Sequence, residues 1–144
     1  MTNSDQRVSD NRIYEYSQRP MRFVTPRSEH AQPGGGGVDV AEVSPSTTGA
    51  ENIYMGRFRV PAGAQSMPHY HADCESAVYM LSGRLNVRWG EGLENAFSLE
   101  PGDMVYVLPR ETHLLENPSE DVVAEYLVAR DGPEEHSVEV PWAT

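Results

Sequence analysis

The sequence predicts an all-β fold, and three observations lead to this prediction. From Ile53 onward, short runs rich in Val, Tyr, Leu and Met follow one another along the chain. Gly, Pro or Asn-Pro turn signals separate these runs roughly every 8 to 12 residues, a spacing typical of antiparallel sandwiches and barrels. No window with a helical period is stronger than these strand signals. The chain of 144 residues is long enough for one such domain with a hydrophobic core.

The N-terminal part of the chain has a different texture. Residues 1–12 are polar and carry no period, so we expect a frayed or partner-dependent arm. Residues 13–24, IYEYSQRPMRFV, place apolar and aromatic side chains at near-alternating positions, interrupted by Pro20. This pattern predicts either an edge strand or a strand that is exchanged between the two copies of a dimer.

A glycine-rich segment follows. Residues 26–52 are rich in Gly, Pro, Ser and Thr, and their four consecutive glycines disfavour any regular element. We expect this segment to form a mobile loop over one mouth of the domain. The chain is therefore predicted to divide into an N-terminal arm with its loop, residues 1–52, and a β-barrel, residues 53–144.

The expected barrel begins with IYMGRFRVPAG, which alternates and stops at Pro-Ala-Gly as a strand does. EGLENAF is long enough for one helical turn at most, and SVEVPW near the C-terminus predicts a last edge strand. The strands between them are expected at ESAVYMLSG, RLNVRWG, NAFSLEPG, DMVYVLP, THLLEN and VVAEYLVAR.

Charge and composition exclude several classes of partner. A formal net charge of −11 and a pI near 4.7 argue against nucleic acid and anionic membranes, which would repel this surface. Cys74 is the only cysteine, so an intrachain disulfide cannot form. The N-terminal residues lack the apolar core of a secretory signal, and no apolar run approaches the length of a membrane span. We expect a soluble, cytoplasmic protein that acts on a small molecule.

The strongest chemical signal is a pair of histidines one residue apart. His69 and His71 stand in PHYHADCES, with Glu75 close behind. Residues two apart in a strand point to the same face, so the two imidazoles project side by side, and the parity of Glu75 allows its carboxylate to reach the same interior. Burying three polar side chains together is unfavourable unless something satisfies them. The pattern therefore predicts a metal site.

A further ligand is expected from another strand. His113 lies in PRETHLLEN, after a turn, where a second strand would bring it to the same interior. Imidazole and carboxylate ligands suit Zn, Fe, Mn, Ni and Cu. We expect one divalent transition metal, Fe, Zn, Mn or Ni, at this site.

The same residues resemble the first sequence motif of the cupin superfamily, G-x5-H-x-H-x3-4-E-x6-G. In this chain the motif residues are Gly63, His69, His71, Glu75 and Gly83. Seven residues, one more than in the common form, separate the glutamate from the last glycine.

A second stretch resembles the second cupin motif, G-x5-P-x-G-x2-H-x3-N. Gly102, His113 and Asn117 fall at the expected spacing in GDMVYVLPRETHLLEN. Leu108 stands where proline is usual, and Arg110 replaces the usual glycine. Because glycine there serves a turn with positive φ, arginine predicts a changed turn geometry.

The resemblance implies a small single-domain cupin, a double-stranded β-helix with a jelly-roll-like barrel. It implies that His69, His71, Glu75 and His113 surround one metal ion. It also implies a homodimer, which exchange of the N-terminal strands between two copies would produce.

One face of each strand must line the barrel and could contact a substrate. Parity groups Tyr106 with two other apolar residues of its strand, and Met55 is expected to share the lumen. Arg57 either points inward as a polar contact or faces water. Arg110 either clamps a carboxylate or phosphate at the barrel mouth or is a solvated turn residue. Such a lumen suits a small, largely apolar or aromatic substrate.

Three functions fit a metal with open coordination positions. The first is a non-haem iron oxygenase. The second is a redox-neutral isomerase, cyclase or lyase, in which Zn, Mn or Ni polarises an enolisable substrate. The third is a non-catalytic cupin that binds a small ligand. In the enzymes, Glu75 or Tyr79 is expected to transfer the proton.

Overall fold

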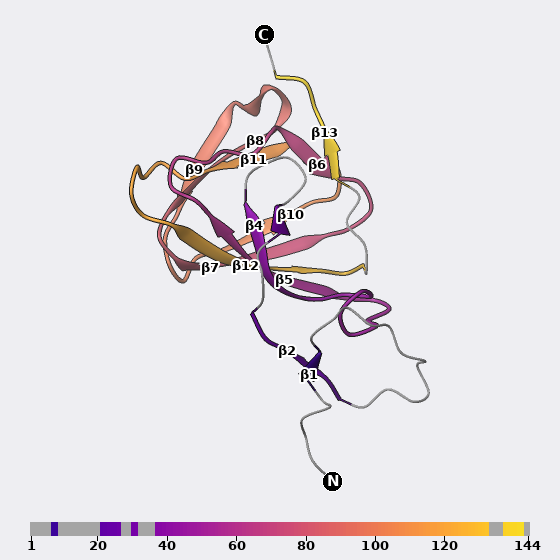
Figure 1. Ribbon diagram of the computed structural model, residues 1–144. Helices are drawn as coiled ribbons and strands as arrows, with labels where there is room; N and C mark the ends of the chain where they lie inside the picture. Colours follow the sequence, from indigo (N-terminus) through magenta and orange to yellow (C-terminus); the bar gives the residue numbers. More distant parts are fainter. Residues whose placement is uncertain (1–6, 9–20, 27–29, 32–36, 133–136, 143–144) are drawn as a thin grey trace.

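Two antiparallel β-sheets form the body of the protein, and they face each other in the computed structural model (Figure 1). The structure describes residues 7–8, 21–26, 30–31, 37–132 and 137–142. Within these ranges the only helical element is the single 3-10 turn η3, Glu91–Leu93. No helix in the described ranges is long and apolar enough to cross a membrane.

The larger sheet has six strands, and each one pairs antiparallel with its neighbours. In spatial order these strands are β10 (Met104–Val107), β7 (Ser76–Ser82), β12 (Ala124–Arg130), β5 (Tyr54–Val60), β4 (Val38–Val43) and β3 (His30–Ala31).

The second sheet has five strands, again all antiparallel. In spatial order they are β13 (Ser137–Glu139), β6 (His69–His71), β11 (His113–Glu116), β8 (Leu85–Trp89) and β9 (Asn95–Leu99).

From β5 to β13 the chain passes repeatedly between the two sheets, and only β8 and β9 are consecutive strands of one sheet. This winding is the double-stranded β-helix of a jelly-roll barrel. The prediction of an all-β barrel is confirmed. The strands expected from Ile53 onward are present, with β13 as an edge strand.

The N-terminal segments show where tertiary pairing overrides local sequence. β3 and β4 both lie inside the segment that was expected to be an irregular loop, and that expectation is corrected for residues 30–31 and 38–43. The sequence of β4, VDVAEV, supplies β-branched residues, and pairing with β5 satisfies its backbone. Further upstream, β1 (Arg7–Val8) pairs in parallel with β2 (Phe23–Val24), below the barrel in Figure 1. The rest of the predicted 13–24 strand, residues 13–20, lies outside the described residues.

A closed hydrophobic core fills one end of the barrel. Side chains from both sheets meet there, which shows that the two inner faces pack against each other at this end. The buried members are Val60, Met80, Leu85, Val87, Leu99 and Ala124.

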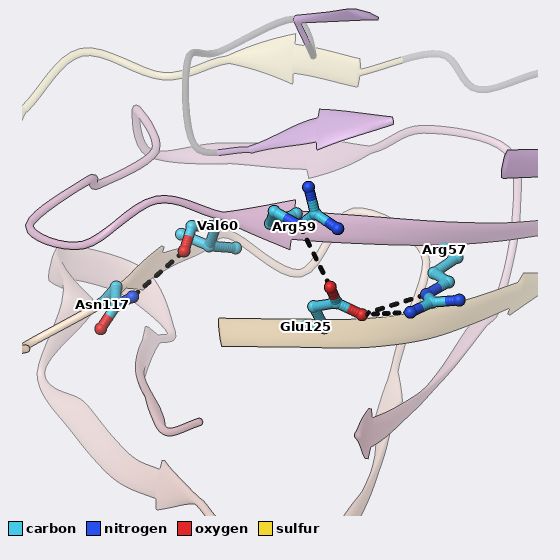
Figure 2. A network of polar contacts seen from close by, with 5 residues as sticks. All are labelled: Arg57, Arg59, Val60, Asn117 and Glu125. Carbon is cyan, nitrogen blue, oxygen red and sulfur yellow. Dashed lines mark hydrogen bonds and ion pairs between the residues drawn. The ribbon is translucent and has the colours of Figure 1, made fainter. Parts of the chain in front are cut away.

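Asn117 fastens the strands at this closed end. Its buried amide donates hydrogen bonds to the carbonyl oxygens of Val60, at 3.1 Å, and Val122, at 2.8 Å. Its side-chain oxygen accepts the backbone N–H of Ser119 at 3.0 Å. Figure 2 shows the bond that joins Asn117 to the last residue of β5. The asparagine of the second motif is thus a structural residue.

A charged cluster lies on the adjacent strands β5 and β12 (Figure 2). Arg57 donates two hydrogen bonds to one carboxylate oxygen of Glu125, at 3.0 and 2.7 Å, and Arg59 donates to the other oxygen at 3.1 Å. Burial raises the pKa of Glu125, but the two guanidinium groups outweigh this effect and lower the pKa below its ordinary value.

Candidate metal centre and cavity

Three histidines converge at the other end of the barrel. His69 and His71 project from one face of β6, and the Cα of His113 on β11 lies directly opposite that of His69. One potential ligand atom from each ring lies within 4.8 Å of those of the other two. The ring centroids are 4.4 to 5.2 Å apart. The antiparallel pairing of β6 with β11 therefore builds the cluster.

Backbone carbonyls fix the tautomers of two of these rings. Nδ1 of His69 lies 2.7 Å from the Met67 carbonyl oxygen, and Nδ1 of His113 lies 2.8 Å from the Glu111 carbonyl oxygen. A carbonyl can only accept, so Nδ1 carries the proton in both rings. Nε2 of each then has a lone pair to offer a metal, as the same hydrogen bond from Nδ1 to a carbonyl arranges in many metalloproteins.

The surroundings of His113 keep its imidazole unprotonated. His71 and His113 are buried, and burial together with the neighbouring His69 lowers the pKa of His113 to about 3. The positive charge of Arg130 acts in the same direction. Metal ions bind the neutral imidazole, so His113 is ready to coordinate at neutral pH.

This donor set fits a divalent transition metal. Three imidazoles with available nitrogens are a ligand set that catalytic metal sites use, with further positions open to water or substrate. The structure therefore contains a candidate site for one metal ion, held by His69, His71 and His113.

Glu75, the fourth expected ligand, lies outside this group. Its side chain is exposed, and one carboxylate oxygen accepts a hydrogen bond from the phenol of Tyr106. That hydrogen bond is the main cause of a raised pKa of Tyr106. The inward position at the start of β7 belongs instead to Ser76, which is only 4% exposed.

The sequence carried a signal for this substitution. Counting the usual six residues back from Gly83 leads to Ser76, not to Glu75. The seven-residue spacing thus marks a chain in which serine occupies the position that the family motif gives to glutamate, while the neighbouring glutamate points outward.

A cavity of about 330 Å³ opens beside the histidines. It is at the small end of the range of ligand pockets, and its volume equals that of about eleven water molecules at ~30 Å³ each. Most of its wall is apolar. The polar residues that line it are His71, Ser76, Tyr106, Glu111, His113 and Arg130.

Strand alternation decides which predicted pocket residues reach this cavity. Tyr106 has outward parity, because its strand partner is Ala77, and it is 57% exposed, but it still contacts the cavity at the rim. On β5 the inward residues are Tyr54, Gly56, Phe58 and Val60, so Met55 and Arg57 lie on the outer face. On β7 the lining residues are Ser76 and Val78, which places Tyr79 on the outer face, where its strand partner is Met104.

Arg110 occupies a left-handed turn. Its φ is 64°, so the turn keeps the geometry that glycine usually serves, and the prediction of a changed geometry is wrong. The turn is held because the Arg110 N–H donates to the His71 carbonyl oxygen at 2.8 Å. The side chain is exposed and is not among the residues that line the cavity.

Several cavity residues were missed in the sequence. Glu111 and Arg130 are polar lining residues that no motif singled out, and the aromatic residues Trp89 and Phe97 also line the cavity. Strand alternation could have identified Arg130. Arg130 stands two residues after the buried Val128 on β12, so it shares the inward face.

Comparison with known proteins agrees with this geometry. A family model described as a cupin domain matches residues 56–130, which is more than half of the chain. The chain belongs to the cupin family. The barrel, the histidine cluster and the two sequence motifs are therefore features of a cupin, and the prediction of a small cupin domain is confirmed.

Solved cupin structures share this fold at low sequence identity. A variant of Bacillus subtilis oxalate decarboxylase has a TM-score of 0.65 and 18% identity over 79% of this chain and 30% of its own. An oxalate oxidase in complex with glycolate has a TM-score of 0.63 and 18% identity over 75% of this chain and 56% of its own.

A further Bacillus subtilis oxalate decarboxylase structure, from a study of its Mn(II) centres, has a TM-score of 0.62 and 18% identity over 81% of this chain. The present chain spans about a third of the decarboxylases and little more than half of the oxidase. No curated protein sequence matches it.

Proposed function

We propose that this cupin is a metal-dependent enzyme that acts on a small, largely apolar or enolisable organic substrate, with a non-haem iron oxygenase as the leading reaction class. The observation that carries the proposal is the cluster of His69, His71 and His113, of which His71 and His113 line a mostly apolar cavity. Bound there, a divalent ion would polarise a chelated carbonyl or, as iron(II), supply redox chemistry with dioxygen.

The three-histidine set supports a catalytic rather than a structural role. All three ligands are neutral, so the full charge of a divalent ion would remain available to a substrate. A barrel with its own closed core does not need a metal to hold it together, whereas structural metals serve folds that lack such a core.

The solved oxalate decarboxylase with Mn(II) centres supports manganese as the metal. Manganese would favour the redox-neutral alternative, an isomerase, cyclase or lyase, which could equally use Zn or Ni. A non-catalytic small-ligand-binding cupin is the remaining alternative.

Proton transfer is assigned to residues at the cavity. Glu75 holds the phenol of Tyr106 at the rim, so this pair can pass a proton between substrate and solvent. Glu111 is the carboxylate that lines the wall itself. Tyr79 is left out of this assignment, because it does not line the cavity.

The first experiment is elemental analysis of protein purified without added metal, together with O2 uptake over a panel of enols, diketones and phenols. Iron with oxygen consumption supports the oxygenase. Stoichiometric Zn, Mn or Ni without uptake supports redox-neutral catalysis or ligand binding. Absence of metal, even after reconstitution, overturns the proposal.

Matched variants test the ligand set. His71→Ala and His113→Ala should each lower metal content and abolish turnover, because each removes one of three ligands. Glu75→Gln should keep full metal content, because its carboxylate is engaged at the rim. A loss of metal in Glu75→Gln that equals the loss in the histidine variants would return Glu75 to the ligand set.

We also propose that the protein is a cytoplasmic homodimer. The outer face of the larger sheet exposes several large apolar side chains, among them Met55, Tyr79 and Met104, which is 77% exposed. Exposed apolar patches of this kind mark interaction sites. Sedimentation should give a dimer that Met104→Glu dissociates. Deletion of residues 1–20 tests whether strand exchange contributes, and cell fractionation tests the location.

A further inference from the structure

Two polar residues lie side by side on the cavity wall, on neighbouring strands of the larger sheet. The Cα of Ser76 at the start of β7 pairs with that of Arg130 at the end of β12. Both side chains line the cavity and both are buried, at 4% and 8% exposure. The Ser76 hydroxyl has no hydrogen-bond partner among the described residues. A buried hydroxyl in this position indicates a ligand or water that completes it.

Tyr54 positions the guanidinium of Arg130. The two residues are cross-strand partners on β5 and β12, and the guanidinium carbon lies 4.8 Å from the centre of the tyrosine ring. This cation–π contact compensates part of the loss of hydration that burial of Arg130 entails.

The charge of the cavity favours an anion. Among the residues that line it, Arg130 carries a positive charge and Glu111 a negative one, and these formally cancel. A divalent ion at the three neutral histidines would leave the cavity with a net charge of about +2. Because the surrounding wall is mostly apolar, this charge is poorly screened.

The rest of the wall defines what the anion is attached to. Trp89 and Phe97 line the cavity from β8 and β9, and valines and leucines supply most of the remaining surface. Such a wall binds an aromatic or aliphatic body, while one polar cluster fixes its orientation.

We propose that Arg130 and Ser76 form an anion-binding subsite beside the histidine cluster, and that the ligand of this cavity is a small carboxylate with an apolar, preferably aromatic, body. The guanidinium holds the carboxylate as a charge-assisted pair, and the serine hydroxyl donates a further hydrogen bond. The inference deepens the proposed function and rests on it, in that this carboxylate would be the substrate of the metal centre.

The test measures binding of phenylacetate and of its neutral isostere phenylacetamide by NMR titration, first to metal-free protein and then to Zn(II)-loaded protein. The variants are Arg130→Gln, Arg130→Lys and Ser76→Ala. Arg59→Gln is the matched control, because Arg59 is an arginine on the same sheet whose guanidinium pairs with Glu125 and does not line the cavity.

The wild-type protein should prefer phenylacetate over phenylacetamide. Arg130→Gln should weaken phenylacetate binding about 10- to 100-fold, the effect expected for a lost charge-assisted hydrogen bond, and should change phenylacetamide binding little. Ser76→Ala should weaken it by about 3- to 10-fold. Arg59→Gln should bind both probes as the wild type does.

Equal binding of the two probes by the wild type, or an unchanged preference in Arg130→Gln, overturns the inference. If Arg130→Gln does not fold, the wild-type preference and the Ser76→Ala and Arg130→Lys titrations decide. Metal content of each protein separates the two proposals. If the protein prefers phenylacetate but takes up no metal, only the proposed function is wrong. If the protein takes up metal but shows no such preference, only the present inference is wrong.

Discussion

Each of two histidines in the candidate metal site is oriented by a carbonyl two residues before it, Met67 for His69 and Glu111 for His113. The same local device thus serves β6 and β11. The tautomer needed for coordination follows from backbone geometry, and no additional side chain is required to select it.

The positive φ of Arg110 strains the backbone, and a substitution at this residue tests how much stability the strain costs. A non-glycine residue with φ of 64° loses about 1–2 kcal/mol relative to glycine, whereas glycine gains about 0.4–1 kcal/mol of freedom in the unfolded chain. We therefore expect Arg110→Gly to raise the free energy of unfolding by about 1 kcal/mol, or 2–4 °C in Tm. Thermal unfolding measures this. Arg110→Ala, which keeps the strain, is the control.

The same variant separates the two roles of Arg110. If the side chain is only a solvated turn residue, Arg110→Gly should leave kcat/KM within about 2-fold of the wild type. A drop of about 10-fold or more, which corresponds to ~1.4 kcal/mol, would show that the guanidinium contacts the substrate.

At the scale of elements, the inner face of the larger sheet is built as cross-strand rows. Ser76, Arg130 and Tyr54 form one row across β7, β12 and β5, and the next row inward contains Gly56. The polar row lies beside the histidine cluster, and the apolar rows lead to the closed core. Register therefore places the polar groups, because a slip of one residue would turn the row to the outer face.

Gly56 leaves space for the rings on either side of it. A Cβ there would lie 2.6 Å from the Tyr54 hydroxyl oxygen and 2.7 Å from a ring carbon of Phe58. We expect Gly56→Ala to lower the free energy of unfolding by about 1–3 kcal/mol, the range for overpacking a core. Chemical denaturation measures this. A change of less than about 0.5 kcal/mol would show that both rings move freely.

The Arg57–Glu125–Arg59 cluster gives a second prediction at this scale. Glu125→Gln should lower the free energy of unfolding by about 1 kcal/mol at pH 7, as expected for partly exposed cross-strand ion pairs. The pKa of Glu125 is lowered in the folded protein, so this contribution is present above the ordinary value of 4.5 and is lost as the pH falls below it. Urea unfolding at pH 7 and in acid measures the difference.

Glu100→Gln, which changes an exposed carboxylate away from this cluster, is the matched control. A difference between wild type and Glu125→Gln that persists unchanged in acid would contradict the electrostatic explanation.

For the protein as a whole, the two ends of the barrel have different roles. One end is closed by apolar side chains from both sheets and by the hydrogen bonds of Asn117. The other end holds the histidines and the cavity. The closed end stabilises the fold, so the open end can carry buried polar groups that reduce stability.

The burial of His113 at the open end predicts how the stability of the protein depends on pH. His113 has a pKa of about 3 in the folded, metal-free protein, against 6.5 when unfolded. The unfolded chain therefore binds a proton more readily, and the metal-free protein should lose stability as the pH falls from 6.5 toward 3. Thermal unfolding across this range measures the slope. His113→Asn should show a smaller loss, and equal slopes in the two proteins would contradict the assignment.

The amino-acid sequence was enough to predict the all-β fold, the positions of the strands from Ile53 onward, and the meeting of His69, His71 and His113. These features depend on local signals. Turn residues punctuate the chain, alternation pairs two histidines on one face, and two motifs of fixed spacing bring in the third. Such signals can be read from neighbours along the chain.

Which face of each strand points inward could not be predicted from the sequence. Alternation shows that Met55 and Phe58, or Glu75 and Ser76, lie on opposite faces, but it cannot say which of them faces the partner sheet. That choice belongs to the packing of the two sheets. It turned Met55, Arg57 and Tyr79 outward and brought Ser76 and Arg130 to the cavity. Strand β4 likewise exists because β5 offers it a partner, which its own glycine-rich surroundings do not reveal.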